Sequence, residues 1–312
     1  MRDLHSWLRT AHAQGRFDLP LPGSGATPRR LASLYEFGTL DLSFARLAEA
    51  HTDATAILAE AGCAAPPDKL FGVWASESPD SELRLGRSSG GMRLDGCKKY
   101  CSGAALVDSA LVTARGEEGV MLIAVDLERA GIAVQNSTWA TPAFAATCTA
   151  TVNFDDVAVA AEQVVGPANW YLERVGFWHG AVGPAACWAG GARGLVDAAR
   201  ALRRRDAHSK AQLGALEADD WGARALLHDA GRQIDEDADD AHGAARTRAL
   251  SLRHLIERLS TDVLDRFGRA TGPQLLAFDA DVARRHAELS LYIRQCHAER
   301  DLESLADLSG RE

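Results

Sequence analysis

The spacing of the apolar residues changes twice along this chain, and this change limits the folds that it can adopt. Up to about residue 66 apolar residues recur at helical spacing, and the segment Ala64-Ala65-Pro66-Pro67 then breaks the helix. Strand-like apolar runs follow, and helical spacing returns in the last part of the chain. The sequence therefore predicts three regions: helical residues 1–66, a β-domain at 67–170 and a helical bundle at 171–312.

In the central region, turns rich in Gly and Asp separate apolar runs such as 105–113 and 120–125, a spacing typical of an antiparallel barrel or sandwich. In the last region, amphipathic helices with short connections imply an antiparallel bundle. One apolar stripe there ends at Phe267, so we expect Gly268 to cap that helix. The glycines of 190–194 follow no strand, and we expect them to permit close helix packing rather than to bind phosphate.

The composition argues against several partners and sites. The formal net charge of the 312 residues is −9, which argues against nucleic acid or an anionic membrane as the main partner. No apolar run reaches the roughly 18 residues that span a bilayer, and residues 1–7 contain no apolar signal-peptide core. We therefore expect a cytoplasmic protein. The six cysteines form no Cys-x-x-Cys or zinc pattern, so we expect free thiols and no metal site.

Two segments of the central region carry a family resemblance. The first is Leu94-Asp95-Gly96-Cys97-Lys98-Lys99-Tyr100-Cys101-Ser102-Gly103, in which a strand and a turn lead into a second strand. The second is Val152-Asn153-Phe154-Asp155-Asp156-Val157, a short strand with a paired-acid turn. In this order, followed by a long helical half, they resemble the middle domain of the acyl-CoA dehydrogenase family. The resemblance implies an α+β, mainly α fold: a shortened N-terminal helical region, a middle antiparallel β-barrel domain and a C-terminal helical bundle.

The resemblance also implies FAD as the cofactor, with part of its site in the β-domain. The segment 73–81 matches the family's loop under the flavin ring, and 96–102 matches its Gly-x-Lys-x-aromatic-x-Thr motif. In these matches Tyr100 would flank the ring, while Ser76 and Ser102 would hydrogen-bond its polar edge. An ordinary strand residue is the alternative for Tyr100. The implied contacts in this domain are Trp74, Ser76, Tyr100, Cys101 and Ser102.

Three further cofactor contacts are implied in the helical bundle, where family members meet the cofactor of a neighbouring subunit. Arg205 falls where the family carries an Arg-x-x-Phe-Gly motif, whose arginine binds the flavin pyrophosphate. A solvated basic helix end is the alternative for this residue. Gly268 and Gly272 are similar to glycines of the family's Gly-Gly-x-Gly loop. Cofactor sites shared between subunits imply a homodimer or a homotetramer.

The position of the family's catalytic base is the main departure. The family places a glutamate where this chain has Arg294, and an arginine cannot abstract a proton from an acyl thioester. The remaining candidates for a catalytic role are His297, Glu299 and His179, and a structural role is the alternative for each. Flavin monooxygenases built on this fold resemble the chain in offering histidine near the flavin, where imidazole can activate a substrate hydroxyl.

Three functions are consistent with these residues. The first is an FAD-dependent oxidoreductase that oxidises an acyl thioester or acyl-like substrate by hydride transfer to flavin, with a flavoprotein or oxygen as electron acceptor. The alternative on the same fold is a flavin-dependent monooxygenase. The alternative of another class is a non-catalytic family member that acts as a scaffold or as a subunit of a hetero-oligomer. Tyr100 and Ser102 favour a bound flavin, whereas Arg294 favours the two alternatives.

Overall fold

The computed structural model describes residues 3–88, 91–135, 138–202 and 206–309. They form two compact units. We name the first the β-unit, which contains the residues up to Asp18 and Leu47–Phe177, and the second the helical unit, which contains Leu19–Arg46 and the residues from Trp178 onward. Helix α3 (Leu42–Glu60) begins in the helical unit and ends in the β-unit. The division of the chain at residues 66 and 170 stays a prediction.

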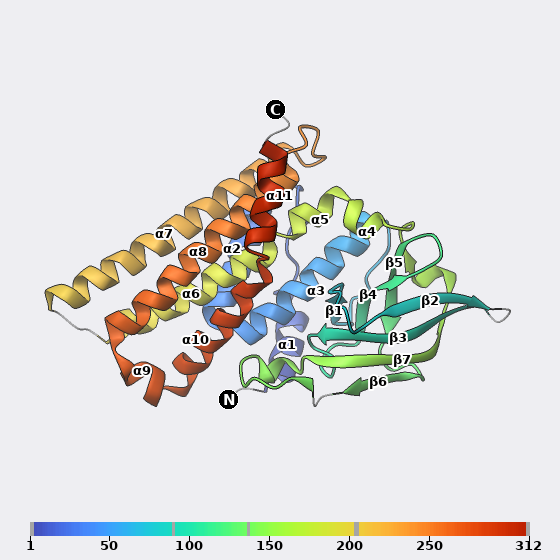
Figure 1. The fold of residues 1–312 in the computed structure, drawn as a ribbon, viewed down its shortest axis with the longest axis horizontal. Coiled ribbons are helices and arrows are strands. Elements are labelled where there is room, and N and C mark those ends of the chain that lie inside the picture. The colour runs from blue at the N-terminus through green and yellow to red at the C-terminus, as the bar shows by residue number, and fades with distance from the viewer. Residues whose placement is uncertain (1–2, 89–90, 136–137, 203–205, 310–312) are drawn as a thin grey trace. The chain divides into compact units, whose positions relative to one another are not determined.

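The β-unit contains an eight-stranded sheet (Figure 1). Its strands are β1 (Phe71–Trp74), β2 (Leu83–Ser88), β3 (Gly91–Cys101), β4 (Ser109–Arg115), β5 (Val120–Asp126), β6 (Ile132–Gln135), β7 (Ala150–Val159) and β8 (Val164–Val165). The strand order is β6-β7-β3-β2-β4-β5-β8, and β1 pairs with β4 beside this path. The pairs are antiparallel except for those of β4 with β1 and with β2. The prediction of a mainly antiparallel β-domain is confirmed.

The sheet does not close into the barrel that the sequence predicted. Closure needs a hydrogen-bonded ladder that continues around the whole ring. Here β2 and β4 meet only at the pair Arg84↔Arg115, and β8 contains just the two residues Val164–Val165. Strands this short and this loosely joined cannot complete a ring, so the prediction of a barrel was wrong on closure.

Strand β4 lies inside the sheet and is buried on both faces. One face of β4 contributes Ala110, Val112 and Ala114 to a hydrophobic core of the β-unit. The opposite face contributes Leu111 to a second core, which also contains Ile57 of α3. Successive strand residues alternate between faces, so covering both faces requires the continuous apolar run seen in the sequence. Burial of a leucine such as Leu111, which is 0% exposed, stabilises the fold by roughly 1.5–3 kcal/mol.

Short helices complete the β-unit. In α1 (Leu4–Ala13), the carboxylate of Asp3 caps the helix by accepting the N–H of Ser6 at 3.2 Å. Helix α4 (Trp170–Glu173) is followed by Arg174, whose guanidinium pairs with the carboxylate of Glu60 at the end of α3. This ion pair therefore joins the end of α3 to the segment that follows α4. The helix α5 (Val175–Gly180) comes next and carries the chain into the helical unit.

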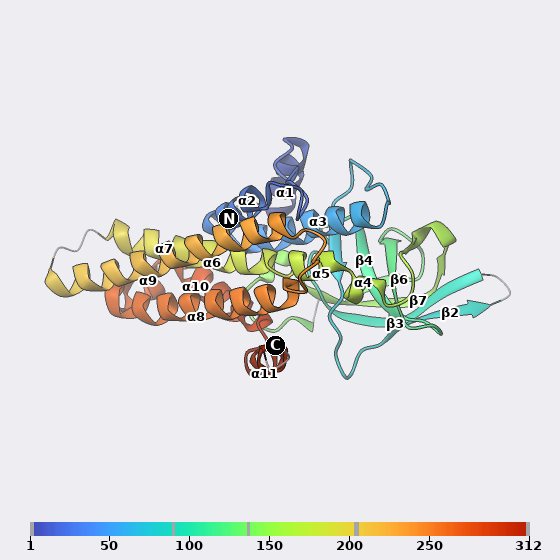
Figure 2. The same cartoon turned by 90° about the horizontal axis from the view of Figure 1, so that it is seen from above.

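The helical unit is a bundle in which the long helices α6, α7 and α8 run side by side (Figures 1 and 2). Its helices are α2 (Thr27–Leu40), α6 (Gly183–Ala201), α7 (Ala207–Glu236), α8 (Ala245–Thr271), α9 (Pro273–Phe278), α10 (Ala280–Tyr292) and α11 (Glu299–Ser309). The predicted end of a helix at Gly268 was wrong. Helix α8 continues to Thr271 because Ala270 and Thr271 are buried, and this packing favours another helical turn.

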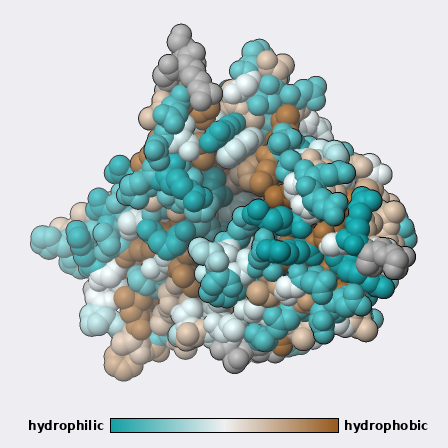
Figure 3. Space-filling view, turned by 45° about the vertical axis from the view of Figure 1, so that its right-hand side comes forward, coloured by the Kyte–Doolittle hydropathy of each residue, from teal (hydrophilic) through white to brown (hydrophobic). Residues whose placement is uncertain are grey.

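No helix in the described part of the chain is both long enough and apolar enough to cross a membrane. Hydrophilic side chains cover most of the face drawn in Figure 3, and the hydrophobic ones form separate small patches on it. Small, separate areas of exposed apolar side chains are ordinary on protein surfaces.

Candidate functional site

The end of strand β3 carries the most unusual backbone position among the predicted site residues. Tyr100 has φ of 60°, a left-handed conformation that a bulky residue rarely adopts. The pairing of β3 with β7 shifts between Lys98 and Cys101, so a β-bulge places Tyr100 here. Its side chain is 55% exposed. Such a conformation costs roughly 1–3 kcal/mol and is concentrated at functional sites, which makes Tyr100 a candidate ligand contact.

Lys98 holds the loop after β1 against the strand that carries Tyr100. Its side chain is buried, and its Nζ donates to the carbonyl oxygen of Ser76 at 3.1 Å and to Oγ1 of Thr113 at 2.8 Å. Burial lowers the pKa of Lys98, because the charged ammonium loses its hydration. The lysine of the predicted Gly-x-Lys-x-aromatic motif thus fixes Ser76 relative to β3 and β4.

Ser102, the second predicted contact on this segment, belongs to a chain of hydroxyl groups. Oγ1 of Thr149 donates to Oγ of Ser102 at 3.2 Å, and Oγ1 of Thr147 lies 2.8 Å from that of Thr149. The hydroxyl of Thr147 also donates to the carbonyl oxygen of Phe144 at 2.8 Å. These contacts restrict the rotation of the Ser102 side chain. The two threonines were not predicted, since nothing local in the sequence indicates that the segment before β7 returns to the end of β3.

Two other predicted contacts lie inside the β-unit core. Trp74 is 2% exposed, and its indole Nε1 donates to the carbonyl oxygen of Ser102 at 3.0 Å. Cys101 is fully buried, its Sγ donates to the carbonyl oxygen of Lys98 at 3.3 Å, and burial raises the pKa of its thiol to about 12. Both side chains support the backbone beside Tyr100. A direct cofactor contact by either one stays a prediction.

Five polar or aromatic residues of the β-unit form a group at the end of β3, in which Lys98 is hydrogen-bonded to Ser76 and Thr149 to Ser102. Tyr100 stands between Lys98 and Ser102 in the sequence. We name this group the strand-end cluster, and its members are Ser76, Lys98, Tyr100, Ser102 and Thr149. It presents an exposed aromatic ring together with fixed hydroxyl and backbone oxygen groups. An aromatic face beside polar groups is the arrangement that a flat heteroaromatic molecule requires.

The three predicted catalytic residues belong to the helical unit and are not joined by hydrogen bonds in the described structure. His297 has a side chain that is 57% exposed, and its Nδ1 lies 3.4 Å from Oδ1 of Asp301. Glu299 is exposed in the first turn of α11. His179 is buried, with its Nε2 3.0 Å from the carbonyl oxygen of Ala238. Their catalytic roles stay predictions.

Arg294, which stands at the position of the family's glutamate, forms an ion pair in this chain. The guanidinium of Arg294 donates from Nη2 to Oε1 of Glu257 at 2.6 Å, in an ion pair between the segment after α10 and helix α8. The side chain of Arg294 is 56% exposed. This pair leaves the position without a proton acceptor of its own.

The remaining predicted cofactor residues, Gly268, Gly272 and Arg205, show no feature that indicates a ligand in the part of the chain that the structure describes. A side chain at Gly268 would meet no atom within 4 Å, and Gly272, with φ of 66°, separates α8 from α9. Arg205 lies outside the described residues. Among the described residues, no group of three or more His, Cys, Asp and Glu side chains is placed to hold a metal ion.

The chain resembles several solved enzyme structures over nearly its whole length. FMN-bound TdsC from Paenibacillus sp. A11-2, also described as dibenzothiophene monooxygenase, has a TM-score of 0.81 and 16% identity, over 97% of this chain and 94% of that chain. Methanesulfinate monooxygenase MsuC from Pseudomonas fluorescens has a TM-score of 0.77 and 17% identity, over 99% and 95% of the two chains. Nitrososynthase from Micromonospora carbonacea var. africana has a TM-score of 0.81 and 17% identity, over 97% and 87%.

No protein-family model and no curated protein matches the chain. At identities of 16–17% the likeness to the solved structures establishes the fold alone. The expected combination of helices and a mainly antiparallel sheet is confirmed. The relation to the acyl-CoA dehydrogenase family stays a prediction.

Proposed function

We propose that this chain is a flavin-dependent monooxygenase that uses FMN. The observation that carries the proposal is the match, over almost the full length of both chains, to proteins described as monooxygenases or as FMN-bound. The same likeness favours this alternative over dehydrogenation of an acyl thioester. The ion pair of Arg294 with Glu257 points in the same direction, because the dehydrogenase reaction needs a carboxylate base at that position.

The residues of the strand-end cluster fit a flavin. Tyr100 offers an exposed aromatic side chain to flank the ring, and the hydroxyl groups of Ser76 and Ser102 suit its polar edge. A bound, reduced flavin would supply two electrons for the reduction of dioxygen, with one oxygen atom entering the substrate and the other leaving as water. Of the two predicted histidines, His297 is the favoured proton-transfer residue, because its imidazole is accessible to solvent whereas that of His179 is buried.

Anaerobic titration of the full chain with oxidised and reduced FMN, and with FAD, tests this proposal through changes in flavin absorbance and fluorescence. We expect FMN to bind, and Tyr100→Ala to weaken binding by about tenfold because an aromatic contact is lost. Trp221→Ala is the matched control, since Trp221 is 69% exposed on α7, and it should leave the affinity unchanged. Incorporation of ¹⁸O from ¹⁸O₂ into indole or dibenzothiophene, used as probe substrates, would support oxygen insertion.

Two results would contradict the monooxygenase proposal. Bleaching of the bound flavin by an acyl-CoA without oxygen would favour the dehydrogenase. Failure of FMN and FAD to bind in either redox state would leave the non-catalytic alternative as the better interpretation.

A further inference from the structure

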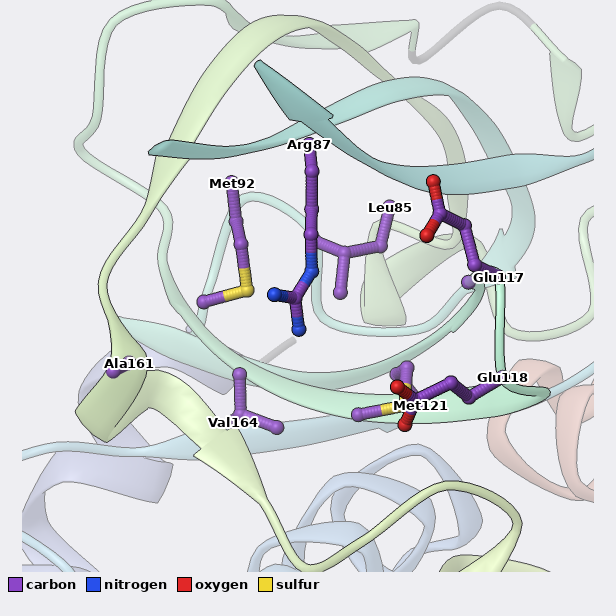
Figure 4. Close-up of a pocket in the computed structure, with 9 residues that line it drawn as sticks. Leu85, Arg87, Met92, Glu117, Glu118, Met121, Ala161 and Val164 are labelled. Atoms are coloured by element: carbon purple, nitrogen blue, oxygen red, sulfur yellow. The ribbon is translucent and has the colours of Figure 1, made fainter. Parts of the chain in front are cut away.

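A second candidate site lies in the β-unit, at the end of the sheet where the barrel fails to close. A cavity of about 260 Å³ separates the β2–β3 hairpin from the β4–β5 turn and β8 (Figure 4). Met92 on its wall and Tyr100 stand eight residues apart on β3. At about 3.3 Å per residue, an extended strand would separate these two residues by up to roughly 26 Å, and Tyr100 does not line the cavity. It is therefore a different site from the strand-end cluster.

The floor of the cavity is apolar and adaptable. Leu85, Met92, Met121 and Val164 line it and are only partly buried where they pack against the core of the β-unit. Two of these four side chains are thioethers, which adjust to irregular shapes and make favourable contacts with aromatic rings. A cavity of about 150 Å³ already holds a benzene molecule, so this one can hold a ring and a polar group.

Charges of both signs stand around this floor. In Figure 4 the guanidinium of Arg87 lies between Met92 and Leu85, the carboxylate of Glu117 lies on the other side of Leu85, and that of Glu118 overlaps Met121 in this view. Within the described part of the chain, none of these three groups forms an ion pair at 4 Å or less. By contrast, Arg84 on the same strand pairs with Glu82 at 2.6 Å, as does Arg115 at 3.1 Å.

We propose that this cavity binds a small zwitterion with an apolar body, of which an apolar α-amino acid is the simplest example. Its carboxylate would pair with Arg87, whose planar guanidinium can bind both carboxylate oxygens. Its ammonium group would face Glu117 and Glu118, and its side chain would lie on the apolar floor. The proposal does not depend on flavin binding, because it uses none of the residues of the strand-end cluster.

Calorimetric titration of the full chain with three related probes tests this inference. The probes are L-phenylalanine, phenethylamine, which lacks the carboxylate, and 3-phenylpropionate, which lacks the ammonium group. For a ligand of this size we expect a dissociation constant of roughly millimolar order, with L-phenylalanine the tightest of the three. Arg87→Gln should weaken the binding of L-phenylalanine by about fivefold and leave the affinity for phenethylamine unchanged.

Two further variants separate the charges. The double variant Glu117→Gln with Glu118→Gln should weaken the binding of L-phenylalanine and of phenethylamine but not that of 3-phenylpropionate. Arg84→Gln is the matched control, because Arg84 is already paired and does not line the cavity. Equal affinity of the three probes, or no binding of L-phenylalanine at 10 mM, which is roughly ten times the expected constant, would overturn the proposal. Unchanged binding by Tyr100→Ala would confirm that the site is independent of the proposed flavin site.

Discussion

His51 is enclosed in the β-unit by groups from several elements. Its Nδ1 accepts the N–H of Phe71 on β1 at 3.2 Å, so this nitrogen carries no proton. The imidazole of His12 on α1 meets it edge-on, with the ring centroids 4.9 Å apart. The charge of Asp108, which forms an ion pair with Arg9, also acts on His51. Burial, followed by the neighbouring His12, lowers the pKa of His51 to about 4.

This lowered pKa predicts that the β-unit loses stability in mild acid. Between about pH 6.5, the ordinary value for an unfolded chain, and the folded pKa, the unfolded state binds the proton and the folded state does not. Stability should therefore fall as the pH falls from 6.5 towards 4, by about 3 kcal/mol in total. Urea unfolding at a series of pH values measures this loss, and His51→Gln should remove most of its pH dependence.

The matched control for this experiment is His228→Gln, because His228 is exposed on α7. That variant should keep the pH dependence of the original chain. An identical loss of stability with and without His51 would contradict the prediction and would assign the acid sensitivity to other groups.

Among the secondary-structure elements, the contact of α2 with α6 depends most clearly on glycine. A side chain at Gly190 would place its Cβ 2.0 Å from the carbonyl oxygen of Tyr35, which is backbone and cannot move without moving α2. A side chain at Gly38 would come within 2.3 Å of the carbonyl oxygen of Cys187. The glycines of this segment thus permit close helix packing, as the sequence indicated, and the two helices meet at backbone distance.

Gly190→Ala should destabilise the helical unit by about 2 kcal/mol or more, since overpacking outweighs the gain of about 1 kcal/mol in helix propensity. Gly214→Ala in α7 is the matched control, because a Cβ there meets no atom within 4 Å. The control should stabilise the unit by about 0.5–1 kcal/mol. Denaturant unfolding followed by circular dichroism compares the two variants, and equal effects of both would contradict the packing argument.

The sequence predicted the elements better than it predicted their connections. Apolar periodicity located the strands and the long helices because burial of one face imposes that periodicity. Closure of the barrel was wrongly predicted, since it depends on pairing between the two end strands of the sheet, β6 and β8, which local patterns do not specify. The bulge at Tyr100 was missed for the same reason, because a bulge is defined by the register with β7. Tyr100 itself was singled out through its motif, and its contact with a flavin stays a prediction.

At the scale of the whole molecule, the predicted cofactor contacts are divided between the two units. Those on 74–102 belong to the β-unit, whereas Gly268 and Gly272 belong to the helical unit. A ligand that binds only the folded structure stabilises it against unfolding. The stabilisation is about 2.7 kcal/mol when the ligand concentration is one hundred times the dissociation constant. The distribution of that stabilisation over the chain therefore reports which unit supplies the contacts.

We predict that FMN at this concentration slows amide hydrogen exchange in peptides from both units, because the family resemblance assigns contacts to each of them. Exchange measured peptide by peptide with mass spectrometry reads the two units separately in one experiment. Tyr100→Ala should diminish the protection in both units, since the resemblance implies that each bound flavin contacts the β-unit of one subunit and the helical unit of its neighbour. Protection confined to the β-unit would leave the strand-end cluster as the flavin site and would contradict the contacts assigned to Gly268 and Gly272. Protection confined to the helical unit would contradict the strand-end cluster instead.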